Sequence, residues 1–347
     1  MSVSDHRTIS AAFVRAIGAR QPLSANQQSA LLAECDIPES VLTSDRARIR
    51  PAQFARLIEA VTELSGDESL GYNKHPQKPG TLLALMRYAH NSEDLLQAFE
   101  RHIELFNLFD FGYKVSLQQR DDYAFYRLSP EPGFELTSWT CEQHMLMHHR
   151  YFCWLCGTRL PLLRVNLHYP VPRHRDEYHY LFHTETRFAQ AHTDFVFARR
   201  LLSLPIVRSA AELEEFLPRV PYELMHMPDQ DGSYTEQIRR YLKKSLPQLP
   251  NYEHIAEALG IGAQTLRRRL AQEGCDYRQL KHELLRDLAI DLLADPELDI
   301  KSISYQLAFS EPSAFIRSFK KWTGSSPGEY RRNNTISTEQ DTTKPPP

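Results

Sequence analysis

The chain has 347 residues, enough for roughly two domains. Apolar residues make up 41% of it and charged residues 24%, which is a globular composition and excludes a disordered or collagen-like chain. No apolar run approaches the roughly 18 residues that a membrane-spanning helix needs. The net charge is −3, so any contact with nucleic acid must come from a local basic surface.

The N-terminus lacks a basic start followed by an apolar stretch, so we expect no secretory signal. The five cysteines are an odd number scattered through the chain, which suits a reducing compartment better than a disulfide framework. We therefore expect a cytoplasmic protein.

The periodicity of apolar residues from Arg7 to Leu108 predicts helices. One begins at Pro51 and ends before Gly66, because proline is tolerated in a first helical turn and glycine favours the end. A second is expected to begin at Ser92 and to end before Phe109.

The next hundred residues mix strand and helix patterns, which predicts an α+β first domain. Short β-rich runs on either side of Arg120-Asp121-Asp122 predict a hairpin. The predicted strands are 113–119, 123–128, 163–168, 177–182 and 193–197, and the predicted helices are 137–156 and 210–217.

A turn-prone polar stretch follows, and beyond it almost every segment has a helical pattern. The expected organisation is an effector-sensing or oligomerisation domain over 7–225, a linker over 226–234, an all-α domain over 235–332 and a disordered tail over 333–347.

Two segments of the all-α part share one pattern: an apolar stripe, a short turn and a second apolar stripe. The first turn lies at 260–262 and the second at 308–310, which predicts two helix-turn-helix units. The second helix of each unit is basic, and a helix of this kind fits the DNA major groove. The plainer interpretation of the run Arg267-Arg268-Arg269 is a solvated helix face.

A long helix predicted over 277–294 separates the two units. Eighteen residues at about 1.5 Å each span about 27 Å, which approaches the ~34 Å between successive major-groove faces of one DNA turn. One chain can therefore place two reading helices on one side of a duplex, joined by this long helix, without a dimer.

Residues 251–331 resemble the DNA-binding domain of the AraC/XylS family of transcription regulators. The closing motif carries most of the resemblance: Phe315-x-Arg317-x-Phe319-Lys320-Lys321-Trp322-x-Gly324-x-x-Pro327-x-x-Tyr330-Arg331. Two positions depart from the family pattern, with Ser304 in place of alanine and Ala308 in place of glycine. Alanine at a turn with positive φ would cost about 1 kcal/mol.

Residues from about 11 to 224 resemble the arabinose-binding-type sensor domain that precedes the DNA-binding domain in the branch typified by ornithine-utilisation regulators. Pro79-Gly80-Thr81-Leu82 and Leu201-Leu202-x-Leu204-Pro205 are among the matching segments. This resemblance implies an effector pocket or an oligomerisation surface, without implying arabinose.

The resemblance also implies which residues face DNA. Glutamine can pair with adenine and arginine with guanine, whereas phosphate contacts position the protein without specifying sequence. The implied base contacts are Gln264, Arg267, Arg268, Ser313, Ile316 and Arg317, and the implied phosphate contacts are Arg269, Lys320 and Lys321. Leu266, Leu270, Phe315, Phe319 and Trp322 are assigned to the core.

One further cluster invites a chemical interpretation. His144 and His148 lie one helical turn apart, near Cys141, Cys153 and Cys156, and could form a metal or redox site. The alternative is a buried helix rich in sulfur and aromatic rings. The histidines at 174, 179, 183 and 192 either line a pocket for an acidic ligand or lie on the surface.

Together these features predict a sequence-specific transcription regulator that binds double-stranded promoter DNA and senses a small metabolite. An amino acid, a small organic acid and a fatty acyl group fit the first domain equally well. Activation through RNA polymerase is what the family implies, with repression still open and a homodimer expected through the first domain. No catalytic residue, cofactor or metal site is assigned; the second hypothesis is a metal- or thiol-based sensor or enzyme with accessory DNA binding.

Overall fold

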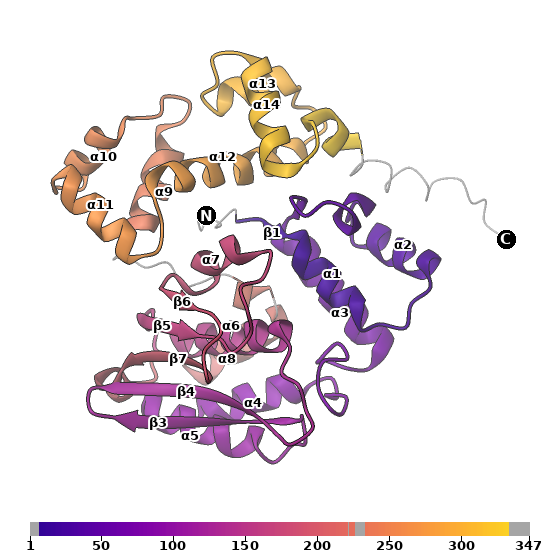
Figure 1. Ribbon diagram of the computed structural model, residues 1–347, viewed down its shortest axis with the longest axis vertical. Coiled ribbons are helices and arrows are strands. Elements are labelled where there is room, and N and C mark those ends of the chain that lie inside the picture. Colours follow the sequence, from indigo (N-terminus) through magenta and orange to yellow (C-terminus); the bar gives the residue numbers. More distant parts are fainter. Residues whose placement is uncertain (1–6, 221, 226–232, 333–347) are drawn as a thin grey trace. The chain divides into compact units, whose positions relative to one another are not determined.

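The computed structural model describes residues 7–220, 222–225 and 233–332 (Figure 1). The chain forms two compact units. One, the sheet unit, comprises residues 61–230 and 272–274; the other, the helical unit, combines residues 1–60 with 231–271 and 275–347. The first is α+β and residues 233–332 of the second are all-α, which confirms the predicted fold class. Over the described residues, no helix has the length and apolarity needed to cross a membrane.

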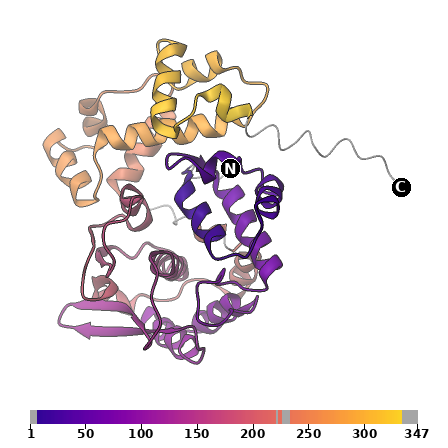
Figure 2. The same cartoon turned by 45° about the vertical axis from the view of Figure 1, so that its right-hand side comes forward.

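The sheet unit contains a five-stranded sheet with the order β3-β4-β7-β5-β6. Neighbouring strands are antiparallel except β5 and β6, which are parallel. The strands are β3 (Tyr113–Arg120), β4 (Tyr123–Pro130), β5 (Leu162–Asn166), β6 (Thr186–Arg187) and β7 (Thr193–Ala198). The predicted hairpin of β3 and β4 is confirmed (Figure 2). Asp121 in its turn has a φ of 51°.

Helices α5 and α6 contact strands of this sheet, α5 at β3 and α6 at β7. Phe99 of α5 packs against both α6 and the sheet. Its ring centroid lies 3.8 Å from that of Phe152 on α6 and 5.6 Å from that of Phe197 on β7. All three side chains are almost fully buried. The helices of the unit are α4 (Thr81–His90), α5 (Leu95–Phe106), α6 (Ser138–Leu155), α7 (Tyr178–Phe182) and α8 (Ala210–Phe216).

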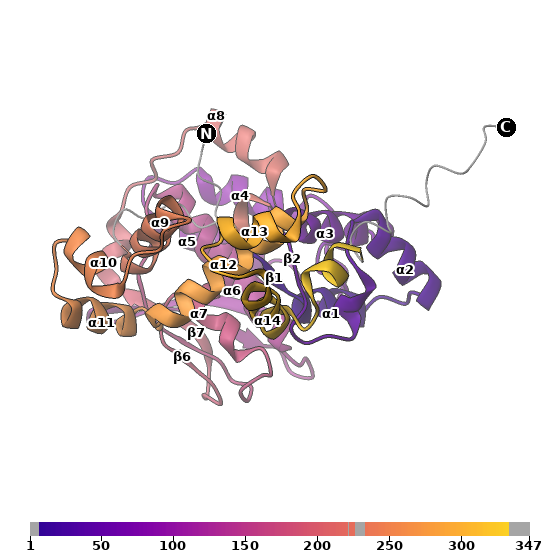
Figure 3. The ribbon, with the colours of Figure 1, turned by 90° about the horizontal axis from the view of Figure 1, so that it is seen from above.

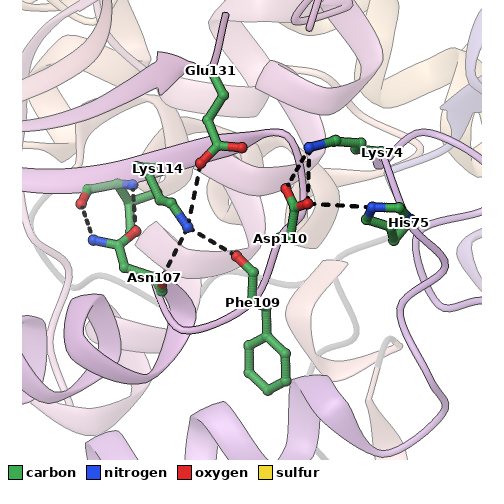
Figure 4. Close-up of polar contacts among 8 residues, drawn as sticks. Lys74, His75, Asn107, Phe109, Asp110, Lys114 and Glu131 are labelled. Atoms are coloured by element: carbon green, nitrogen blue, oxygen red, sulfur yellow. Dashed lines mark hydrogen bonds and ion pairs between the residues drawn. The ribbon is translucent and has the colours of Figure 1, made fainter.

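Asn107 follows the last residue of α5 and forms two hydrogen bonds with the backbone of β3. Its side-chain amide donates to the carbonyl oxygen of Val115 at 2.8 Å, and its side-chain oxygen accepts from the Val115 N–H at 2.9 Å (Figure 4). The Lys114 ammonium donates to the carbonyl oxygens of Asn107 and Phe109 in the same turn. The side-chain amide of Asn107 therefore satisfies the backbone N–H and C=O of Val115, as a neighbouring strand would.

Two local predictions in this unit were wrong. The predicted strand 177–182 is helix α7, because Tyr178 and Phe182 are four residues apart and both bury their rings on one helical face. The helix expected from Ser92 begins at Leu95, where the carboxylate of Asp94 accepts a hydrogen bond from the Gln97 N–H at 2.9 Å. A carboxylate at that position caps the helix, and the Ser92 hydroxyl instead donates to the carbonyl oxygen of Ala89.

Residues 233–332 of the helical unit form a series of short capped helices. Asn251, Asp276 and Asp299 cap α10, α12 and α13, each accepting from the N–H three residues later. The helices are α9 (Tyr234–Ser245), α10 (Tyr252–Ala258), α11 (Ala263–Gln272), α12 (Tyr277–Leu293), α13 (Ile300–Gln306) and α14 (Pro312–Thr323), followed by a helical segment over 327–332. Residues 226–232 of the expected linker and the expected tail 333–347 lie outside the described residues.

The N-terminal segment supplies the rest of the helical unit. It consists of β1 (Ile9–Ser10), α1 (Ala11–Ala19), α2 (Ala25–Glu34), a short 3-10 helix (Glu39–Leu42), β2 (Arg48–Ile49) and α3 (Pro51–Ser65), whose residues from Val61 on belong to the sheet unit. The predicted start and end of α3 are confirmed, with Gly66 at φ 65° just after it. Strands β1 and β2 pair antiparallel, and the Arg48 guanidinium donates to the backbone and the hydroxyl of Thr8.

Candidate nucleic-acid interface

The first helix-turn-helix unit is formed by α10 and α11. Gly260 makes the turn at φ 69°, a conformation that suits glycine because it has no Cβ. Leu266 and Leu270 are buried and hold α11 against the core. As a result, Gln264, Arg267 and Arg268 all lie on the exposed side of α11.

The second unit is formed by α13 and α14. Ala308 stands in its turn at φ 64°, so the positive φ expected at this position is present and an alanine occupies it. Phe315 and Phe319 are fully buried in the core. The opposite side of α14 exposes Ser313, Ile316 and Arg317, the three side chains that sequence reasoning selected in this unit.

The three predicted phosphate contacts are also exposed, in two different settings. Arg269 lies 6.0 Å above the ring of Tyr234 on α9, so its guanidinium already has a cation–π partner. Lys320 and Lys321 lie in the last turn of α14, where positive charge complements the helix dipole. Trp322, assigned to the core, is half-buried against it.

Helix α12 joins the two units. It has 17 residues, which at about 1.5 Å per residue span about 26 Å. Helices α10 and α11 lie at one end of it and α13 and α14 at the other (Figure 3). The long helix predicted between the two basic helices is therefore present as α12.

A buried polar cluster anchors α12 to the N-terminal segment, and sequence reasoning missed it. The carboxylate of Asp287 is 1% exposed. It accepts from the Thr8 hydroxyl at 2.6 Å and pairs with Arg286 at 2.9 Å and Arg239 at 3.7 Å. Arg7 forms a second ion pair, with Glu236 of α9. No pattern in the sequence links position 8 to position 287, so only the fold reveals the contact.

A cleft of about 360 Å³ lies beside the N-terminal half of α12 and Trp322. Arg278, His282 and Arg286 give it basic character, with Asp276 and Glu283 as acidic members and Gln279 completing the lining. Burial, followed by the charge of Arg278, lowers the pKa of His282, so this imidazole is neutral at pH 7.

The cysteines of the sheet unit do not have the surroundings of reactive thiols. Burial raises the pKa of Cys153 to about 11 and that of Cys141 and Cys156 to about 12. A thiolate is the reactive form, so these groups are poorly nucleophilic at neutral pH. The sulfur of Cys153 contacts His149 at 3.6 Å, whereas His144 and His148 turn toward a third histidine, His102 of α5.

Of the later histidines, His174 contacts an acid from its own unit. Its Nε2 lies 3.0 Å from the buried carboxylate of Glu142 on α6, which also accepts hydrogen bonds from the Tyr178 and Tyr169 hydroxyls. His192 is exposed, and His179 and His183 are partly buried.

A regulator with a sensing domain followed by paired helix-turn-helix units is the class of protein that this arrangement defines. Residues 27–206 match the arabinose-binding N-terminal domain of AraC transcription regulators, and residues 255–333 match a helix-turn-helix domain family. The chain belongs to the AraC family of transcription regulators. It is a DNA-binding regulator whose N-terminal domain is of the small-molecule-binding type.

Similar proteins include the ornithine utilization regulator of Pseudomonas aeruginosa, 24% identical over 306 residues that cover 88% of this chain and 90% of the relative. The virulence regulon transcriptional activator VirF of Shigella flexneri is 26% identical over 132 residues, or 38% of this chain and 48% of VirF. Among solved structures, the regulator CdpR of Pseudomonas aeruginosa matches with a TM-score of 0.32 and 22% identity, over 88% of this chain and 96% of CdpR.

Proposed function

We propose that this regulator reads promoter DNA with α11 and α14 inserted in successive major grooves. The observation that carries the proposal is the shared design of the two helices, each with a buried apolar side and an exposed polar side at opposite ends of α12. Base contacts are assigned to Gln264, Arg267, Arg268, Ser313, Ile316 and Arg317. Phosphate contacts are assigned to Arg269, Lys320 and Lys321.

In this proposal the functional division of the chain is a sensing domain over 7–225, a linker over 226–234 and a DNA-binding domain over 235–332. A small metabolite in the first domain changes the balance between states in which the reading helices can and cannot engage DNA. The protein acts in the cytoplasm as an activator that contacts RNA polymerase, and a homodimer forms through the first domain. The similarity to VirF, a transcriptional activator, supports this direction of control.

The test is to select binding sites for the full-length protein from random duplexes and then to footprint the best of them. Two reading helices on one rod should protect two short elements about 10 base pairs apart, centre to centre, on one side of the duplex. A footprint with one element, or selection that enriches no sequence, would contradict the proposal.

Substitutions then assign each half of the site. Arg267→Ala with Arg268→Ala should remove protection from one element, and Ser313→Ala with Arg317→Ala should remove it from the other. Lys244→Ala is the matched control, because Lys244 is an exposed cation on α9, outside both reading helices. Its footprint should match that of the unsubstituted protein.

The effector is tested separately by following thermal unfolding of the full chain in the presence of amino acids, organic acids and fatty acids. A ligand that binds only the folded state raises the unfolding temperature as its concentration increases. The same ligand should then change the affinity for the selected DNA site.

A further inference from the structure

Three histidines from two helices meet inside the sheet unit. His102 comes from α5, and His144 and His148 come from successive turns of α6. The ring centroids of His148 lie 3.9 Å from His144 and 4.4 Å from His102. One ring nitrogen of each residue lies within 4.8 Å of one nitrogen from each of the other two. All three side chains are buried.

The hydrogen bonds of His148 leave one of its nitrogens ready to bind a cation. Its Nδ1 lies 2.7 Å from the carbonyl oxygen of His144. A carbonyl only accepts, so Nδ1 carries the proton and Nε2 holds a lone pair. That Nε2 is shielded from solvent and has no hydrogen-bond partner among the described residues. An unpaired buried acceptor is costly, and coordination would satisfy it.

His144 has a tyrosine hydroxyl beside each of its ring nitrogens. Its Nδ1 lies 3.1 Å from the hydroxyl of Tyr113, and its Nε2 lies 2.8 Å from the hydroxyl of Tyr126. The Tyr126 hydroxyl also lies 3.1 Å from Nε2 of His102. Histidine ligands of metals usually hydrogen-bond through the other ring nitrogen, which fixes the orientation of the ring. His144 and His148 both have such a partner already.

We propose that His102, His144 and His148 form a binding site for a divalent transition-metal ion of the zinc class in the core of the sheet unit. Three neutral imidazoles suit such ions, whereas magnesium and calcium prefer oxygen ligands. The Nδ1 of His148 donates to the carbonyl oxygen of His144, so the Nε2 lone pair of this ring is available to the ion. Coordination replaces the two hydrogen bonds to Tyr126 and leaves that hydroxyl beside the ion.

The inference goes beyond the proposed function, because it concerns an inorganic ion in the sheet unit and is measured without DNA. Untagged full-length protein is stripped with a chelator and titrated with Zn²⁺ in competition with a chromogenic chelator. Co²⁺ is then added in place of Zn²⁺, and its visible absorption reports nitrogen ligands. One equivalent of each metal should bind.

Substitutions of the proposed ligands test whether the ion binds at this site. His148→Ala and His102→Ala should each lower the affinity for Zn²⁺ at least tenfold and abolish the Co²⁺ absorption, and Tyr113→Phe should weaken binding by about tenfold. His149→Ala is the matched control: His149 is also buried and lies on the same helix, yet its Nε2 forms a hydrogen bond with the carbonyl oxygen of Leu160. Circular dichroism checks the folding of each variant, and His148→Gln replaces His148→Ala if the latter does not fold.

Retention of full affinity by folded variants of His148 and His102 would overturn the proposal, as would unsubstituted protein that binds no Zn²⁺. Loss of binding in these variants with retention in His149→Ala supports it. Neither result depends on DNA binding, so failure of the metal site and failure of the proposed DNA contacts are distinguishable.

Discussion

The hydroxyl of Tyr330 donates a hydrogen bond to the backbone oxygen of Arg48 at 2.8 Å, across 282 positions of sequence. The tyrosine is buried, and its ring meets the edge of the Phe319 ring at 5.5 Å. One end of this bond is in β2 and the other follows the second helix-turn-helix unit. The N-terminal segment is therefore part of the folded framework that supports α14.

Tyr330→Phe should lower the free energy of unfolding by about 0.5–1.5 kcal/mol, because it removes one buried hydrogen bond and retains the ring. Urea unfolding followed by circular dichroism measures the change. Tyr305→Phe is the control, since Tyr305 is 47% exposed, and it should leave the midpoint unchanged. Equal midpoints for all three proteins would show that this bond contributes nothing.

Asp287→Ala should lower the free energy of unfolding by more than Tyr330→Phe does. The carboxylate is almost fully buried between two guanidinium groups, and removing one partner of a buried ion pair costs about 3–5 kcal/mol. Thermal and urea unfolding of the full chain measure the loss, with Glu297→Ala as an exposed acidic control. A loss close to that of the control would mean that solvent or other groups replace the carboxylate.

Ala308→Gly should stabilise the protein by about 0.4–1 kcal/mol, because φ at this position is 64° and glycine adopts that conformation without a Cβ clash. Ala271→Gly, in helix α11, should have the opposite sign, with a loss of about 0.5–1 kcal/mol. Urea unfolding measures the free energy of unfolding of both variants. Changes of the same sign would contradict the argument that glycine is favoured by the positive φ at position 308 and disfavoured in helix α11.

Arg268→Ala and Lys320→Ala should weaken DNA binding in different ways. The first should cost about 1–3 kcal/mol and relax selectivity at one base, whereas the second should weaken all sequences alike and reduce the salt slope by about 1. Affinities for the selected site and for single-base variants, measured at several salt concentrations, separate the two. Interchanged results would exchange the proposed roles of the two residues.

The five cysteines should resist modification in the native protein. All are buried, and burial raises the pKa of Cys35 and Cys153 to about 11 and that of Cys141 and Cys156 to about 12. Titration with a thiol reagent at pH 8 should be slow before denaturation and should give five equivalents after it. A fast native thiol among Cys141, Cys153 and Cys156 would restore the thiol-based alternative for the first domain.

Local patterns predicted the parts of the fold that depend on neighbouring residues. The turn at Gly260, the exposed face of α11 and the long α12 follow from spacing within a few dozen positions, and the structure contains them. The β3–β4 hairpin was predictable for the same reason. Helix α7 was not, because its aromatic residues also suit a strand and tertiary packing decided between the two.

Sequence patterns did not predict the contacts between residues that are far apart in the chain. His102 lies 42 positions before His144 and shares no motif with it, so the third member of the histidine group emerged only from the packing of α5 against α6. The same holds for Thr8 and Asp287, which are 279 positions apart. Such pairs require a fold before they can be recognised.

The discontinuity of the helical unit has a consequence for biosynthesis. Arg48 is added to the chain 282 residues before Tyr330, a delay of about 14 to 56 seconds at about 5–20 residues per second. The sheet unit lies entirely between these two positions, so it can fold before the partner helices of the N-terminal segment are made. A chain released before Tyr330 is made would therefore contain the whole sheet unit together with an N-terminal segment that lacks this partner.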